Sequence, residues 1–189
     1  MVAMTEKTRA GIRTGGRIAF ILGLAALVGA MSVRTDNTVW QLDPNVCVQC
    51  GNCAVECVLT PSAVKCVHVY GICGYCDLCS GYFRTGAPVL DTGADFQACP
   101  TGALQRRFVE EPFFEYTVDE SLCIGCAQCV VGCTAFGNGS LFLQVRYDRC
   151  LNCNDCSIAR RCPSGAYSRV PMGLPYRLKG SEGLTEAAR

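Results

Sequence analysis

The sequence lacks the residues on which several common chemistries depend. Among its 189 residues there is a single histidine, His68, so the chain has almost no histidine ligands for zinc sites that combine cysteine with histidine. The stretch "GIRTGG" does not follow a strand, as a dinucleotide-binding G-x-G-x-x-G loop should, and no flavin or dinucleotide fingerprint is visible. A twin-arginine export signal is also missing, since Arg17 precedes the N-terminal apolar run alone.

Cysteine, by contrast, is abundant. Seventeen residues are cysteine, a share of about 9% that is far above ordinary usage. A disulfide framework predicts an even number of cysteines, whereas this number is odd and most cysteines lie in tight C-x-x-C runs. Zinc sites use pairs of such runs, whereas triplets dominate here. The pattern C-x2-C-x2-C with a distant Cys-Pro favours iron–sulfur clusters.

Sixteen of the cysteines form four groups. They are Cys47, Cys50, Cys53 and Cys57; Cys73, Cys76, Cys79 and Cys99; Cys123, Cys126, Cys129 and Cys133; and Cys150, Cys153, Cys156 and Cys162. Cys66 is left over. We interpret it as a buried apolar thiol that is not a ligand, and the alternative is that it replaces Cys57 as a ligand.

The spacing also predicts how the groups combine. A C-x-x-C-x-x-C loop wraps one cubane with three thiolates, and we expect the fourth cysteine at the start of a helix, pointing away from that cluster. In two-cluster ferredoxins this fourth cysteine ligates the other cluster. Each group therefore needs a partner group, including the second, in which a long interval separates Cys79 from Cys99.

At this point the array resembles the four-cluster polyferredoxin subunits of membrane-associated bacterial oxidoreductases. Examples are the iron–sulfur subunits of dimethyl sulfoxide reductase and formate dehydrogenase and the ferredoxin-type protein of periplasmic nitrate reduction. The resemblance covers about residues 40–170 and implies that the inner two groups pair and the outer two pair around them. It implies four [4Fe–4S] clusters: cluster 1 on Cys47, Cys50, Cys53 and Cys162; cluster 2 on Cys57, Cys150, Cys153 and Cys156; cluster 3 on Cys73, Cys76, Cys79 and Cys133; and cluster 4 on Cys99, Cys123, Cys126 and Cys129.

The expected fold is α+β and ferredoxin-like, with two nested double-cluster modules within residues 40–170. The outer module joins 47–57 with 150–162, and the inner module spans 73–133. The repeated phrases "CPTGA" and "CPSGA", at Cys99 and Cys162, support two similar halves. Cys57 and Cys133 lack the proline that usually follows, but this proline supplies no ligand. "GALQRRFVEEPFFEYTVDES" predicts two short strands and "GSLFLQVRYD" predicts another.

Before this domain lies a candidate membrane helix. Residues 1–17 form a basic flank, and residues 18–36 contain an apolar run that we expect to be an anchor, short for a bilayer span. A cleaved secretory signal is the alternative. The basic flank favours a cluster domain on the extracytoplasmic face, and Trp40 is expected near the membrane interface. Residues 171–189 are expected to form an irregular arm lying on a partner protein.

The leading functional hypothesis is electron transfer through four clusters, with no catalytic site on this chain. Its partners would be other subunits of a membrane redox complex, either catalytic or of quinone or cytochrome type. The formal charge of +1 would become about −7 once four oxidised clusters were counted, which argues against nucleic acid. The alternatives are a redox sensor or assembly ferredoxin and a catalytic iron–sulfur protein with one open-site cluster.

Overall fold

The computed structural model describes residues 37–69, 73, 76, 78–84 and 97–180. The chain divides into two units, Met1–Asn37 and Thr38–Arg189, and the account below concerns the second. The predicted membrane helix at 18–36 lies outside the described residues. Within the described ranges, no helix is both long and apolar enough to cross a bilayer.

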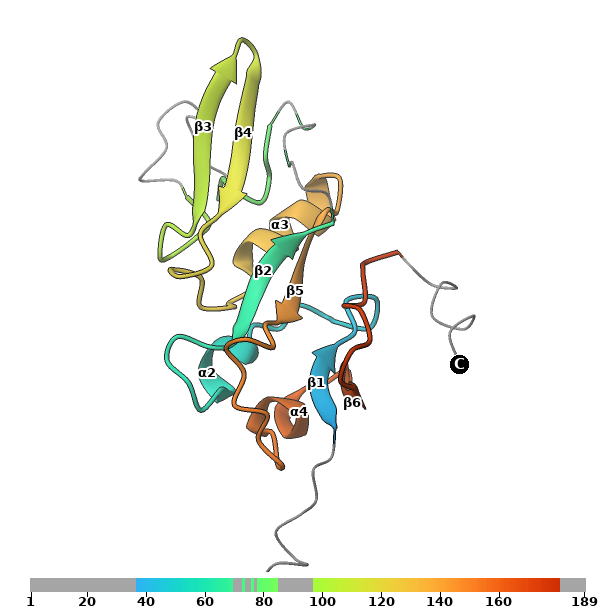
Figure 1. Ribbon diagram of the computed structural model, residues 1–189. Coiled ribbons are helices and arrows are strands. Elements are labelled where there is room, and N and C mark those ends of the chain that lie inside the picture. The colour runs from blue at the N-terminus through green and yellow to red at the C-terminus, as the bar shows by residue number, and fades with distance from the viewer. Residues whose placement is uncertain (1–36, 70–72, 74–75, 77, 85–96, 181–189) are drawn as a thin grey trace, which may run out of the picture. The chain divides into compact units, whose positions relative to one another are not determined.

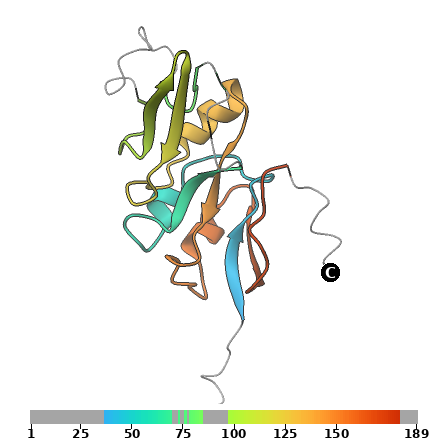
Figure 2. The ribbon, with the colours of Figure 1, turned by 45° about the horizontal axis from the view of Figure 1, so that its top comes forward.

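Within the described residues, six strands form three antiparallel pairs that are nested along the chain (Figure 1). The outermost pair is β1 (Thr38–Leu42) with β6 (Tyr167–Pro171), and within it lies β2 (Val64–His68) with β5 (Leu141–Val145). The innermost pair is the hairpin of β3 (Leu104–Glu110) and β4 (Phe113–Val118). The second view places the β2–β5 pair between the other two (Figure 2). The described part is therefore α+β, and its assignment to the ferredoxin-like class stays a prediction.

Two of these pairs include the strands that the sequence predicted. The hairpin β3–β4 turns at Glu111-Pro112, and β5 occupies the apolar stretch before Cys150, so these three strands are confirmed. All five residues of β5 are buried, because α3 packs against this strand and β1 also contacts it. Such two-sided burial explains its largely apolar sequence, in which Gln144 is the polar exception.

Three short helices each begin close to the third cysteine of a group. They are α2 (Cys53–Glu56), α3 (Gln128–Phe136) and α4 (Ser157–Arg161). The expectation that the fourth cysteine begins a helix is wrong. Cys57 and Cys162 directly follow the last residues of α2 and α4, and Cys133 lies inside α3. The reason is that helical turns start at the third cysteine and carry the fourth to the far end of the helix.

The described part of the C-terminal segment, after β6, packs on its own domain. Residues 172–180 are irregular, and the expected contact of the arm at 171–189 with a partner protein stays a prediction. Tyr176 stacks on Tyr147 with ring centroids 4.3 Å apart, and Arg177 forms an ion pair with Asp43. The backbone carbonyl of Arg177 also accepts a hydrogen bond from buried Gln144 on β5. This segment therefore forms part of the fold.

The buried core consists largely of cysteines and the residues around them. Leu42, Val64, Leu104, Leu141 and Leu143 are each 0–1% exposed. The same cluster contains four cysteines of the two inner groups, Cys53 of the first group and the ungrouped Cys66. Because thiols take the places of aliphatic side chains in this core, its stability depends on the group that those thiols bind.

Candidate metal centres

The cysteines of the inner groups surround two separate cavities. One cavity is lined by Cys73, Cys76, Cys79 and Cys133, which come from the second group and from α3. The other is lined by Cys99, Cys123, Cys126 and Cys129, with Cys66 at its edge. Cys99 thus lies with the third group, while Cys133 of the third group lies with the second. The structure brings together the residues predicted for clusters 3 and 4.

The outer groups exchange their last cysteines in the same way. Cys57, Cys150, Cys153 and Cys156 line a third cavity with almost wholly apolar walls. The remaining outer set has no such cavity among those seen in the described part, but its sulfurs influence one another. Burial raises the pKa of Cys47 most, and its neighbours Cys162 and Cys50 raise it further. These positions match the sets predicted for clusters 1 and 2, although their role as ligands stays a prediction.

Three of the loops share one strained backbone conformation. The residue before the second cysteine has a left-handed φ in each: 59° at Gln49, 75° at Gly125 and 51° at Asn152. In each loop this residue donates its backbone N–H to the sulfur of the first cysteine, for instance Asn152 to Cys150 at 3.4 Å. A left-handed φ is unfavourable for Gln and Asn and persists where the surroundings demand it. The shared geometry indicates that the three loops are shaped to surround the same kind of bound group.

The two Cys-Pro phrases also adopt one conformation. In "CPTGA" the N–H of Ala103 donates to Cys99 Sγ at 3.2 Å, and in "CPSGA" the N–H of Ala166 donates to Cys162 Sγ at 3.4 Å. The glycines Gly102 and Gly165 have φ values of 66° and 61°. The internal repeat found in the sequence is therefore a structural repeat at the level of these turns.

Several of the cysteine sulfurs lie near hydrogen-bond donors and are buried from water. Burial raises the pKa of both Cys53 and Cys79 to about 12. Tyr167 Oη lies 3.0 Å from Cys53 Sγ, and Ser140 Oγ lies 3.4 Å from Cys73 Sγ. Hydrogen-bond donors stabilise a thiolate, whereas desolvation destabilises it unless a cation is bound. The surroundings therefore suit metal-bound thiolates.

No group of three or more Cys, His, Asp or Glu side chains within the described ranges converges on a point that would hold one metal ion. The four thiolates of a cubane bind four different irons, so they stand farther apart than the ligands of a single ion. Cavities walled by four cysteines, with backbone N–H groups aimed at the sulfurs, fit a cluster of that kind.

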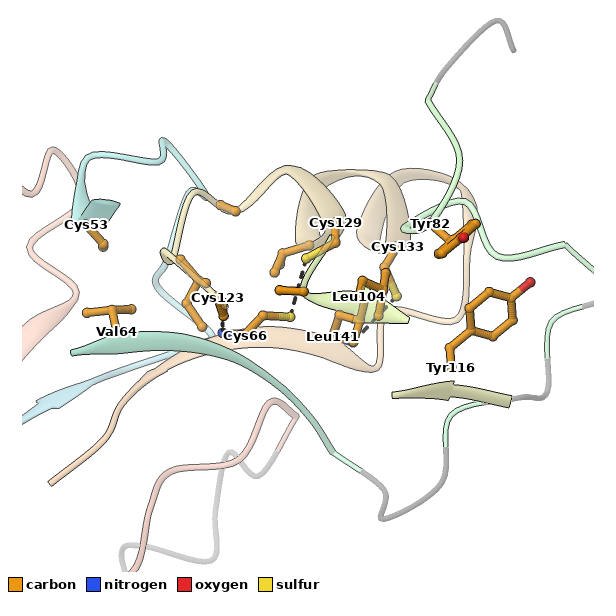
Figure 3. Packing of buried hydrophobic residues seen from close by; sticks show 14 of the residues in the cluster. Cys53, Val64, Cys66, Tyr82, Leu104, Tyr116, Cys123, Cys129, Cys133 and Leu141 are labelled. Atoms are coloured by element: carbon orange, nitrogen blue, oxygen red, sulfur yellow. Dashed lines mark hydrogen bonds between the residues drawn. The ribbon is translucent and has the colours of Figure 1, made fainter. Parts of the chain in front are cut away.

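Cys66 on β2 is not placed with the set that contains Cys57. Its thiol is 2% exposed and lies 3.4 Å from Cys129 Sγ, and its backbone N–H donates to Cys123 Sγ at 3.3 Å (Figure 3). The alternative in which Cys66 replaces Cys57 receives no support from this position. Cys66 instead contacts the sulfurs of Cys123 and Cys129, in the third group.

Two aromatic residues contribute to the outer sets in ways that the sequence did not reveal. Trp40 donates its indole N–H to the carbonyl of Cys153 at 2.7 Å and lines the cavity of that set. The membrane-interface position expected for Trp40 stays a prediction. Tyr167 reaches Cys53 from β6, which is possible only because β6 pairs with β1. No local signal near Tyr167 could have predicted that long-range contact.

Comparison of the chain with protein-family models, with curated proteins and with solved structures gave no match.

Proposed function

We propose that this chain is an electron-transfer subunit that carries four [4Fe–4S] clusters. The observation that carries the proposal is the exchange of fourth cysteines: Cys133 lines a cavity with the second group, and Cys57 lines one with the fourth. Burial of the thiols alone does not require the fourth cysteine of one group to lie with the first three cysteines of another group.

Each cluster, when bound, supplies a centre that takes up and releases one electron. The chain's own contribution is to hold the thiolates rigidly and exclude water. Short helices follow the third cysteines, and left-handed residues fix the loops. A rigid ligand set keeps the reorganisation on electron uptake small.

Contact between the modules supports a continuous route. The loop of the first group lies directly on the loop of the third, because a Cβ on Gly51 would be 2.9 Å from the carbonyl oxygen of Cys126. Clusters 1 and 4 would therefore be neighbours, while ligand exchange makes 1 and 2, and 3 and 4, neighbours within modules. Stepwise transfer requires this adjacency.

The alternatives have less support. A thiol-based redox sensor needs an accessible reactive cysteine, and the unassigned Cys66 is 2% exposed. A catalytic cluster with an open iron needs a set of three cysteines, whereas each of the four sets has four candidate ligands. Attachment to a membrane complex on the extracytoplasmic face is part of the proposal and depends on residues 18–36, outside the described part.

Metal and spectroscopic analysis of the purified chain tests the proposal. We expect about sixteen irons and as many sulfides per chain, with magnetically coupled [4Fe–4S]⁺ signals after reduction. A chain that bound zinc in place of iron, or that showed only isolated, uncoupled clusters, would refute the four-cluster route.

A further inference from the structure

Strand β2 carries a lysine in an unusual place. Lys65 is 0% exposed and is the largest of the fully buried side chains in the described part. Lysine is almost never fully buried without a paired charge. The ion pairs within 4 Å among the described residues do not include Lys65. Its ammonium instead donates a hydrogen bond to the backbone carbonyl of Cys123.

The groups that influence the pKa of Lys65 include two cysteines. Burial lowers its pKa, and Arg149 acts in the same direction, whereas Cys123, Glu120 and Cys57 raise it. Glu120 is already paired with Arg146 at 3.0 Å. The ammonium of Lys65 lies beside a cysteine of the third group, where a bound cluster would supply negative charge.

The neighbouring residue fixes this arrangement. Cys66 donates its backbone N–H to Cys123 Sγ at 3.3 Å, while Lys65 binds the carbonyl of the same cysteine. Both residues lie in the paired part of β2, where Lys65 is opposite Gln144 of β5. Lys65 is thus held beside the third cysteine loop by the sheet.

On the basis of the proposed function, we propose that Lys65 is a buried counter-charge that raises the reduction potential of cluster 4, the cluster assigned to Cys99, Cys123, Cys126 and Cys129. Reduction adds one negative charge to a cluster. A fixed positive charge nearby stabilises the reduced form more than the oxidised form, because little water is present to screen it. Lys65 is a positioning residue: it acts through charge and through Cys123, and it is not a ligand.

The test compares two variants of the loaded protein. Lys65→Met removes the charge and keeps most of the side-chain volume, and Arg107→Gln removes one positive charge from a side chain that is 76% exposed. We expect Lys65→Met, at full iron content, to lower one of the four potentials in an EPR-monitored redox titration. A tenfold weaker reduction equilibrium corresponds to a shift of about 59 mV for one electron. Arg107→Gln should leave all four potentials unchanged.

A fully loaded Lys65→Met protein whose four potentials equal those of Arg107→Gln would overturn the role of Lys65 and leave the proposed function standing. If Lys65→Met loses a cluster, it is compared with Lys65→Arg, which keeps the positive charge. Restored cluster loading in Lys65→Arg supports a role of the charge, and continued loss of the cluster overturns that role. A wild-type chain without iron and sulfide would instead refute the proposed function itself.

Discussion

The inner and outer cysteine modules share the C-x-x-C-x-x-C spacing of their triplets but differ in how deeply the fold buries them. Five of the eight inner cysteines are buried, whereas only Cys53 is buried among the eight outer ones and Cys50 is exposed. The inner module has the nine-residue α3 packed on β5, while the outer helices α2 and α4 have four and five residues. Triplets of identical spacing can thus have different contact with solvent, which is one of the properties that tune a cluster's potential.

The largest expected effect comes from removing pairs of cysteines. If Cys73 and Cys133 serve one cluster, the double variant C73A/C133A should damage one cluster and leave about three intact. The double variant C73A/C99A should damage two, because its cysteines belong to different clusters. Mössbauer spectroscopy counts the intact [4Fe–4S] clusters. The opposite order, with C73A/C99A the milder variant, would show that no exchange occurs in the inner module.

The outer module allows the same test in an independent place. C47A/C162A should leave about three intact clusters and C47A/C57A about two. Agreement in one module and failure in the other would show that the nested pairing is not common to both.

Glycine substitutions should produce the next largest effect. Gly125 has φ 75°, and a Cβ there would lie 2.6 Å from the carbonyl oxygen of Val64; the corresponding contact at Gly51 is 2.9 Å from Cys126 O. Gly165 has φ 61° but nothing within 4 Å. An alanine in the left-handed conformation lowers stability by roughly 1–2 kcal/mol. We expect Gly165→Ala to lower the stability of the protein by that amount, and Gly125→Ala and Gly51→Ala to lower it by more. Thermal bleaching of the clusters measures the order, and equal midpoints for all three would contradict it.

Chelators and oxidants should distinguish the modules by rate. Because the outer cysteines are more exposed, bleaching of cluster absorbance by a chelator should show a fast phase from the outer clusters and a slow phase from the inner ones. In C73A/C133A, which lacks one inner cluster, the slow phase should shrink while the fast phase is unchanged. Loss of the fast phase instead would mean that the inner module is the accessible one.

The smallest effect is expected from single hydroxyl groups. Tyr167→Phe removes a contact of 3.0 Å to Cys53, and Ser140→Ala removes one of 3.4 Å to Cys73. A hydrogen bond to sulfur stabilises the reduced cluster, so each loss should lower one potential. A bond worth about 1 kcal/mol corresponds to about 40 mV for one electron, and the longer contact should give less. A redox titration in which Ser140→Ala gave the larger shift would refute this ranking.

Local patterns predicted part of the fold well. The stretch around Glu111-Pro112 and the apolar run before Cys150 form strands where the sequence predicted them. Strands β1, β2 and β6 were missed, because the residues that pair them lie far apart in the chain: Thr38 is opposite Pro171, and Val64 is opposite Val145. Long-range pairing of short segments leaves little local signal.

The sequence by itself determined the four cysteine groups and the need of each group for a partner, because tight C-x-x-C spacing permits only a few loop geometries; which groups pair was implied by the family resemblance. The tertiary structure decided the surroundings of each sulfur. It alone brought Tyr167 to Cys53 and buried Lys65 beside Cys123, because both contacts depend on strand pairing between distant segments. Spacing is a property of the local chain, whereas burial and charge around a site result from everything that folds against it.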